Sequence, residues 1–491
     1  MNKLNVLTIL AMTAALAASA QVDIHMNPAT YSAVEETQFT SVSVGFSHKM
    51  ADEAEKMELG RGHNLADITV RTVRNLKGGG VAWGGASFTT GRLRDIRFNS
   101  AADYLRVEPY VVGDSVGGSR SMQQYTFSGG YSHRIGSRTT WGAEMDYRAD
   151  IEYRNRDPRV KNVVSDFCLK AGLTQGVSAN YKVGANVGLL IYNQESDIDF
   201  YNPMNDIFEH VNTGAGTTYA RFYGSTSQSA YKGLGFTSGL QFFPIKAPRP
   251  FDIAASVRFD FTDMDFILRD YNDLTLSNAD DYRVVSDLSA KIEAGIVTFR
   301  PAAQFGWTRR IATENIFGTA SGNSYPLLGS RQFFMTERSS FAAALPVVFS
   351  AGESLRFTLA PTVARAVVHG HYRLPERDFK VAHLTSGASL AIDKYFGKSR
   401  LLLKGGATYT DADILNRHFV GLDVRKGPHY AIDHNFRMLS SDRLNINAGL
   451  NADIPVAKKA QFIFVGVDYS HKKVHNHGNI NEVAARVGYR F

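Results

Sequence analysis

The stretch that decides the fold is residues 140–151, which read TWGAEMDYRADI. Its apolar residues alternate with polar ones, and a period of two residues is typical of a β-strand with two different faces. One face carries four charges in succession, on Glu144, Asp146, Arg148 and Asp150. Such a face is expected where a strand lines a water-filled lumen and turns its other face to lipid. The stretch therefore predicts a strand of a membrane-spanning β-barrel.

The same alternation recurs along the chain, in residues 181–192, 251–261 and 444–454. Each stretch is long enough to cross a bilayer as a tilted strand, whereas a strand of a soluble protein usually has about five or six residues. A helix would need apolar residues spaced by three and four, and these stretches do not have that spacing. Their polar faces and that of the last strand add further lumen-lining candidates, which are Lys182, Arg258, Asp260, Asp453, Arg486 and Arg490.

Short and long connections alternate between the expected strands, as they do in outer-membrane barrels with short periplasmic turns and long extracellular loops. Short turns are expected at residues 75–80, 133–138, 174–178, 243–250, 293–295, 350–353, 393–399 and 455–460. Long polar loops are expected at residues 51–64, 91–122, 153–161, 193–228, 263–282, 310–331, 370–380 and 411–442, and a shorter one at 471–479. We therefore expect an all-β, transmembrane, antiparallel up-and-down barrel over residues 39–491, with about 18 strands in a range of roughly 14–18.

The beginning of the chain has the form of a cleavable signal peptide. Lys3 precedes a mostly apolar stretch, which ends in the small residues Ala18-Ser19-Ala20. The apolar stretch is too short to span a bilayer, and the alternative is a buried N-terminal helix. We expect residues 1–20 to be removed on export and residues 21–38 to form a periplasmic segment. That segment is too short for a folded plug domain, but it can enter the lumen.

The chain closes on a strand whose apolar face carries Val487, Tyr489 and Phe491. This pattern resembles the C-terminal strand that outer-membrane barrels present to the barrel-assembly machinery. With the signal peptide and the alternation of loops, it predicts the outer membrane of a Gram-negative bacterium as the location. The expected partners are therefore outer-membrane lipid, lipopolysaccharide and the assembly machinery.

The composition excludes several other classes of protein. Of the 491 residues, 44% are hydrophobic and 21% are charged, which is typical of an ordered chain. No apolar run of eighteen residues follows the first twenty, so a helical membrane protein is excluded. The net charge of +7 is scattered without a basic tract and does not indicate a nucleic-acid partner. Cys168 is the only cysteine, so no intrachain disulfide forms, and a closed hydrogen-bonded barrel would supply the stability instead.

Over its whole length the sequence resembles the uncharacterised outer-membrane β-barrel proteins common in Bacteroidetes. The resemblance is one of architecture and implies no particular activity. The segment Asn27-Pro28-Ala29 is also similar to the N-terminal Asn-Pro-Ala of fatty-acid-transporter-like barrels and of barrels linked to the Bacteroidetes secretion system. The alternative is that these three residues form a turn that starts the first strand.

The sequence contains two fragments of catalytic or nucleotide-binding motifs, but neither has the surroundings in which such a motif works. The only Gly-x-Ser-x-Gly, at residues 113–117, lies in an expected loop and not between a strand and a helix. Gly397-Lys398-Ser399 lacks the earlier glycine of a phosphate-binding loop. We therefore expect no catalytic residue, no enzymatic activity and no cofactor.

Two groups of residues are weak candidates for metal ligands. His369 and His371 share one strand face near the extracellular rim, where two imidazoles can meet one ion. They can equally be exposed polar residues. The acidic residues of one loop can bind Ca²⁺ or form a solvated loop, and these are Asp263, Asp265, Asp280 and Asp281.

Three functions remain open. The preferred one is a channel or transporter for a small solute or lipophilic molecule, with the inward charges setting selectivity and a loop such as residues 91–122 constricting the lumen. The second is a scaffold, a surface-binding barrel or a partner in secretion, which predicts a lumen filled by side chains and loops. The third is an outer-membrane hydrolase, which predicts a Ser/His or Asp/His cluster at one rim.

Overall fold

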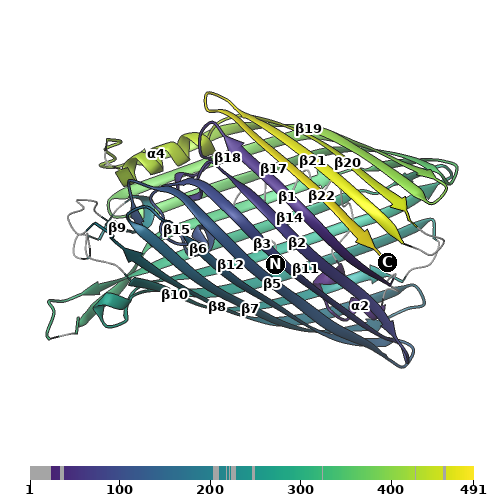
Figure 1. The fold of residues 1–491 in the computed structure, drawn as a ribbon, viewed down its shortest axis with the longest axis horizontal. Coiled ribbons are helices and arrows are strands. Elements are labelled where there is room, and N and C mark those ends of the chain that lie inside the picture. Colours follow the sequence, from purple (N-terminus) through teal and green to yellow (C-terminus); the bar gives the residue numbers. More distant parts are fainter. Residues whose placement is uncertain are drawn as a thin grey trace.

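The protein is a closed antiparallel barrel of 18 strands around one lumen (Figure 1). The computed structural model describes residues 24–33, 38–202, 209–216, 218–219, 222, 228–245, 249–322, 324–425, 427–456 and 461–491. The strands of the wall are β1 (Phe39–Ala51), β2 (Gly62–Leu76), β3 (Gly80–Ile96), β5 (Gly118–Ile135), β6 (Thr139–Tyr153), β7 (Arg159–Gly176), β8 (Tyr181–Asp199), β10 (Gln228–Pro244), β11 (Phe251–Leu268), β12 (Leu274–Ala294), β13 (Val297–Phe299), β14 (Ala302–Phe317), β15 (Leu327–Ala344), β16 (Val347–Ala351), β17 (Leu355–Arg373), β18 (Glu376–Phe396), β19 (Ser399–Phe419), β20 (Arg443–Pro455), β21 (Phe462–Val474) and β22 (Gly478–Arg490).

Two of the crossings are interrupted near a proline, which cannot donate to the ladder. The short β13 continues into β14 past Pro301, and β15 continues into β16 past Pro346. The two short strands also pair with each other, so the wall stays continuous there. The strand number expected from the sequence is confirmed, and the first strand begins at Phe39 as predicted.

The barrel closes between its first and last strands. β1 pairs with β22 from Ser41 opposite Arg490 to Ala51 opposite Ile480. Thr40 and Phe491 add two backbone hydrogen bonds, at 2.7 and 2.9 Å. No strand edge is left to lipid along this seam, as a membrane barrel requires.

The two faces of each strand meet different surroundings. On β1, Val42, Val44 and Phe46 are exposed on the outside, while Ser43 and Gly45 turn inward. The same exposed apolar side chains occur all around the barrel and form its lipid-facing band. The alternation in the sequence therefore corresponds to an apolar outer surface and a polar inner surface of the barrel.

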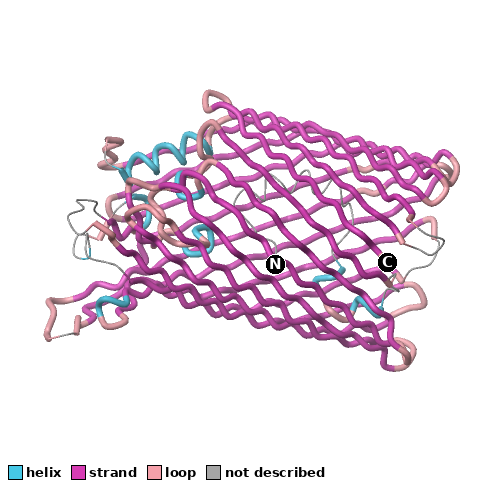
Figure 2. Tube along the Cα trace, in the orientation of Figure 1, coloured by secondary structure: helices cyan, strands magenta, loops and turns pink. Residues whose placement is uncertain are grey.

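Helices are few and short, and they gather at the two ends of the barrel (Figure 2). They are η1 (Ile24–Met26), α2 (Thr30–Ala33), η2 (Met57–Leu59), α3 (Tyr104–Val107), η3 (Gly214–Gly216), η5 (Arg269–Tyr271) and α4 (Gly427–Leu439). A separate two-stranded sheet joins β4 (Val111–Asp114) to β9 (Glu209–Asn212). Within the described residues, none of the helices has the length and apolar character needed to span a membrane.

Several connections predicted as long extracellular loops are largely strand. β11 runs to Leu268 and β12 begins at Leu274, so most of the predicted loop 263–282 belongs to the wall. β17 and β18 likewise meet in a turn inside the predicted loop 370–380. Beyond the lipid-facing band both faces of a strand carry polar residues, so the alternation disappears although the hydrogen-bond ladder continues. The predicted signal peptide lies outside the described residues.

Candidate functional site

The extracellular end of the lumen is occupied by residues 97–117, which connect β3 to β5 and which we call the plug. The plug contains α3 and β4, and β4 pairs with β9 from the connection between β8 and β10. Tyr110, Val111 and Val112 are completely buried in a core made with inward-facing residues of the wall. The loop that the sequence offered as a constriction thus has its middle part inside the barrel.

Three ion pairs join the plug to the wall. Asp103 binds Arg148 of β6, Arg106 lies 2.7 Å from Asp166 of β7, and Asp114 lies 2.8 Å from Arg154. All these carboxylates and the Arg154 guanidinium are largely buried. A buried charge is tolerated only when it is paired and hydrogen-bonded, so these contacts fix where the plug lies.

Two arginines of the wall bind the plug through its backbone. Arg310 of β14 donates to the carbonyl oxygens of Glu108 at 2.7 Å and Arg106 at 3.1 Å, at the end of α3, and is itself held by Asp281. Arg120 of β5 donates to the carbonyl oxygen of Ala101 at 2.7 Å. Without these arginines, the carbonyl oxygens of the plug would lack hydrogen-bond donors inside the barrel. The sequence offers no signal for either arginine, because their partners are irregular backbone.

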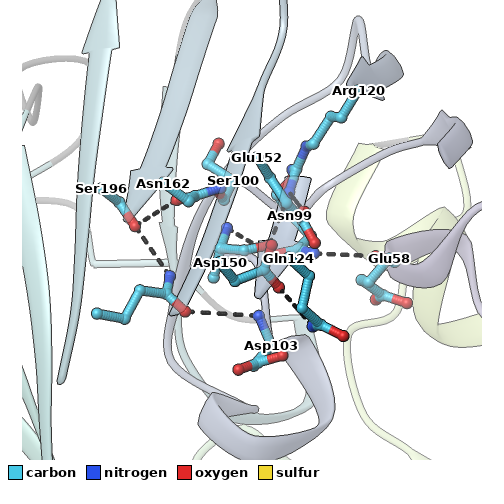
Figure 3. A network of polar contacts seen from close by, with 12 residues as sticks. Glu58, Asn99, Ser100, Asp103, Arg120, Gln124, Asp150, Glu152, Asn162 and Ser196 are labelled. Carbon is cyan, nitrogen blue, oxygen red and sulfur yellow. Dashed lines mark hydrogen bonds and ion pairs between the residues drawn. The ribbon is translucent and has the colours of Figure 1, made fainter. Parts of the chain in front are cut away.

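Neutral polar side chains complete this contact, as Figure 3 shows for the network around Asn99 and Asp103. Asn162 of β7 donates to the carbonyl oxygen of Ser100 at 2.8 Å and accepts from Ser196 at 2.6 Å. Asn99 reaches across the plug to the carbonyl oxygen of Glu58 at 3.0 Å. The network spans several strands, so the plug is attached to one side of the wall by many small interactions.

A second segment enters the lumen at the periplasmic end. The side-chain nitrogen of Asn27 donates to the carbonyl oxygens of Leu173 at 3.2 Å and Ala185 at 3.1 Å, and its side-chain oxygen accepts from the Ala29 N–H at 2.9 Å. Inward-facing glycines make the room for it, because a Cβ on Gly172 would overlap the Asn27 side chain. Asn27-Pro28-Ala29 is therefore a lumen segment and not simply a turn that starts β1.

Trp83 belongs to this second contact and faces the lumen. Its ring stacks on that of Tyr31 at 3.8 Å, and its indole N–H donates to Glu144 at 3.1 Å. Trp141, by contrast, is exposed on the outside. The tryptophans of the sequence are thus divided between the lipid-facing band and the N-terminal segment.

The remaining lumen-lining candidates lie in ion pairs or are buried. Glu144 and Asp146 both bind Lys170, at 2.8 and 3.0 Å. The other pairs are Arg258 with Asp260 at 2.8 Å, Arg490 with Asp453 at 3.2 Å and Arg486 with Asp67 at 3.5 Å. Lys182 is buried on β8. The structure therefore spreads these candidates around the wall and does not gather them into one cluster.

Inward-facing charges in the periplasmic half of the lumen are open to solvent on the side away from the plug. The Arg486 side chain is 51% exposed, and that of Asp468, which binds Lys404 at 3.2 Å, is 56% exposed. Their neighbours Val487 and Val467 are exposed on the opposite, apolar face. The lumen is thus filled at its extracellular end and retains accessible polar space below.

The candidate metal ligands bind other side chains of the protein. His369 and His371 both contact one carboxylate oxygen of Asp378, at 2.8 and 3.3 Å. Asp263 and Asp265 instead bind Asn278, and Asp281 binds Arg310. Within the part of the chain that the structure describes, no group of three or more histidine, cysteine, aspartate or glutamate side chains has an arrangement suited to a metal ion.

One contact resembles a nucleophile and its base, but it lacks the rest of an active site. The hydroxyl of Ser47 lies 3.1 Å from Nε2 of His63. Catalysis of acyl transfer also needs backbone N–H groups free to bind an oxyanion. Around Ser47 the backbone of β1 is paired with β2 on one side and with β22 on the other. The Gly-x-Ser-x-Gly lies in the plug, where Gly113 and Asp114 end the buried strand β4 and Ser115 is exposed in the loop that follows, as the sequence predicted.

Comparison with known protein families identifies the chain. A model described as a family of unknown function, DUF6850, matches residues 28–491. The chain belongs to this family. The match begins within Asn27-Pro28-Ala29 and runs through the last strand, so the DUF6850 barrel includes the plug and most of the N-terminal lumen segment. No curated protein matches the sequence.

Solved structures with a similar fold include the siderophore receptor PiuA from Acinetobacter baumannii, at 8% identity and a TM-score of 0.43 over 93% of this chain and 82% of the receptor. The ferric preacinetobactin receptor BauA from the same organism has 8% identity and a TM-score of 0.41, over 93% and 80%. The outer membrane transporter YddB from Escherichia coli has 7% identity and a TM-score of 0.41, over 93% and 81%. The likeness to the DUF6850 barrel is one of architecture.

Proposed function

We propose that this protein resides in the outer membrane and passes a small solute through its lumen, with the plug as the gate. The observation that carries the proposal is the division of the lumen. Its periplasmic half keeps exposed charges such as Arg486, whereas its extracellular half is largely occupied by the plug. A conduit that opens only when the plug shifts needs both features.

The way in which the plug is held favours a gate over a permanent filling. Beside the buried apolar core around Tyr110, its attachments include ion pairs and hydrogen bonds to the wall, as between Arg106 and Asp166. Water or a charged solute that enters the lumen can take the place of one partner in such a contact, so that each charge stays compensated when the plug shifts. The inward charges, among them Glu144, Asp146, Arg258 and Asp260, would then influence which solutes pass.

A non-transporting scaffold is the second candidate, and the filled extracellular end is the observation that favours it. A scaffold has no need for accessible charged space in the other half of its lumen, which is why we prefer transport. A hydrolase is not favoured, because the Ser47–His63 contact lies in a fully paired part of the sheet.

A reversible tether tests the gate. The variant Ser100→Cys with Asn162→Cys places one thiol on the plug and one on β7, where the native side chain of Asn162 reaches the Ser100 carbonyl at 2.8 Å. Cys168→Ala removes the native thiol. We would measure single-channel conductance in planar bilayers and the swelling of arabinose-loaded liposomes, before and after reduction.

The unmodified protein and the reduced variant should conduct, and oxidation should abolish both signals. The Cys168→Ala protein without the tether is the matched control and should be insensitive to oxidation. Equal conductance of the oxidised and reduced variant would exclude the plug as the gate. Absence of conductance and swelling in all forms would favour the scaffold instead.

A further inference from the structure

A partly open cavity lies beside the plug at the extracellular end of the barrel. It has a volume of about 210 Å³ and is bounded by the plug, α4, the connection at η2 and the inward faces of β15, β17 and β18. Most of its wall is apolar, with the rings of Phe334, Phe379, Phe419 and Phe436 among the lining residues. An apolar cavity of about 150 Å³ can hold benzene, so this one suits a ligand of roughly eight to twelve heavy atoms.

Arg338 is the exception in this apolar wall. It follows Phe334 and Thr336 on the inward face of β15, and all three side chains line the cavity. Within the described residues, the Arg338 guanidinium makes no hydrogen bond and no ion pair. A cation in an apolar cavity without a hydrogen-bonding partner is costly, because the nearby charge of Glu108 offsets its desolvation only in part. An acceptor that enters the cavity would supply the hydrogen-bonding partner that the guanidinium lacks.

The other cations at the cavity already have partners. Arg377 donates to the carbonyl oxygen of Val420 at 3.2 Å, and Arg443 donates to that of Leu439 at 3.0 Å. Lys56 lies 2.6 Å from Glu108. Arg338 is thus the group left to recognise a ligand.

The charge around the cavity favours an anion. Glu108 is shared between Lys56 and nearby arginines, and these cations hold its pKa below the ordinary value against the opposing effect of burial. Burial raises the pKa of Glu58, which favours its neutral form. The lining cations Lys56, Arg338, Arg377 and Arg443 outnumber the lining carboxylates Glu55, Glu58 and Glu108, so the cavity offers more positive than negative charge to a guest molecule.

We propose that this cavity binds a small amphipathic carboxylate, with its acid group on Arg338 and its apolar body against the phenylalanine rings. An aryl alkanoate fits the volume, the aromatic wall and the planar guanidinium, which pairs with a carboxylate through two parallel hydrogen bonds. As the ligand class of the gated conduit, the inference rests on the proposed function, but binding itself needs only the cavity.

Binding of 3-phenylpropionate to the protein in lipid nanodiscs, measured by isothermal titration calorimetry, tests the proposal. The uncharged 3-phenylpropan-1-ol has the same apolar body and should bind about tenfold more weakly or worse, because it cannot pair with a cation. Arg338→Met should reduce the affinity for the acid by at least about tenfold and leave the affinity for the alcohol unchanged.

Arg331→Met is the matched control, since Arg331 stands on the same strand but is exposed and does not line the cavity. It should bind the acid as the unmodified protein does. Arg338→Lys should restore part of the affinity, and thermal unfolding of each variant would confirm that it is folded. Equal affinities for the acid and the alcohol, or unchanged binding by Arg338→Met, would overturn the proposal. Neither result depends on conductance, so the proposed transport is judged separately by the tether.

Discussion

Asp103 of the plug and Arg148 of β6 form an ion pair inside the barrel, 45 positions apart in the sequence. Arg148 also lies 3.4 Å from both Asp150 and Asp166, so the wall supplies spare acceptors for the same guanidinium. Arg148 therefore keeps a carboxylate partner when Asp103 moves away. This arrangement suits a movable attachment.

The variant Asp103→Asn should loosen the plug without unfolding the barrel. Loss of one charged hydrogen-bonding partner weakens the attachment by about 1.5–3 kcal/mol, and Arg148 falls back on Asp150 and Asp166. Single-channel recordings should show more frequent openings of unchanged size. Asp393→Asn breaks an ion pair with Arg400 in the wall, far from the plug, and should leave the openings as they are. Identical recordings from all three proteins would contradict the role given to Asp103.

At the periplasmic end, Asn27→Ala should release the N-terminal segment. The substitution removes two hydrogen bonds to the carbonyl oxygens of Leu173 and Ala185 and the one accepted from Ala29. Gly172→Ala should have the same effect from the other side, because its methyl group takes the place of the Asn27 side chain. Limited proteolysis from the periplasmic side should cut both variants within the segment and spare the unmodified protein. Resistance of both variants would count against the anchoring role of Asn27.

Docking of α4 should weaken in acid. His434 is buried, donates from Nε2 to the Ala54 carbonyl oxygen at 2.6 Å, and burial holds its pKa below the ordinary 6.5. Below pH 6.5 the undocked helix therefore binds a proton that the docked helix resists, so the docked state loses stability as the pH falls toward 5. Hydrogen exchange of the α4 amides, corrected for intrinsic rates, should speed up over this range.

His434→Gln keeps a side-chain donor and should remove this dependence. Glu58, which accepts from Asn435 of the same helix at 2.8 Å, acts in the opposite direction because its pKa is raised. Glu58→Gln should therefore make the acid effect larger. If the exchange rates of the His434→Gln protein still rise between pH 6.5 and 5, another group is responsible.

The two faces of β20 should respond differently to one added charge. Leu450→Arg places a guanidinium on the lipid-facing band and should cost about 2–4 kcal/mol near the bilayer centre. Asn447→Arg places it on the inward face, which is open to solvent, and should be nearly neutral. A folded barrel and an unfolded one migrate differently on gels, so the temperature at which the mobility changes measures the stability of both variants. Equal loss of stability would mean that the assignment of faces is wrong.

The wall was predictable from the sequence because lipid and water impose opposite demands on alternate residues. Beyond the lipid-facing band both faces of a strand meet water, and the alternation of apolar and polar residues disappears. Asp263 and Asp280 face each other across β11 and β12, yet they read as loop residues because they lie beyond the lipid-facing band. The plug was predictable only as a candidate constriction, since its contacts join residues such as Arg310 to irregular backbone. Arg338 carried no sequence signal, because the cavity that it lines is built from distant segments.

The pairing of β1 with β22 also dictates an order of events. The seam joins the first strand of the barrel to its last strand, so the cylinder stays open until the last strand has arrived. Both the plug and the Asn27 segment lie inside the cylinder. They must be inside when the last strand pairs, or they must enter later through an open end of the barrel. The topology therefore couples closure of the wall to the filling of the lumen.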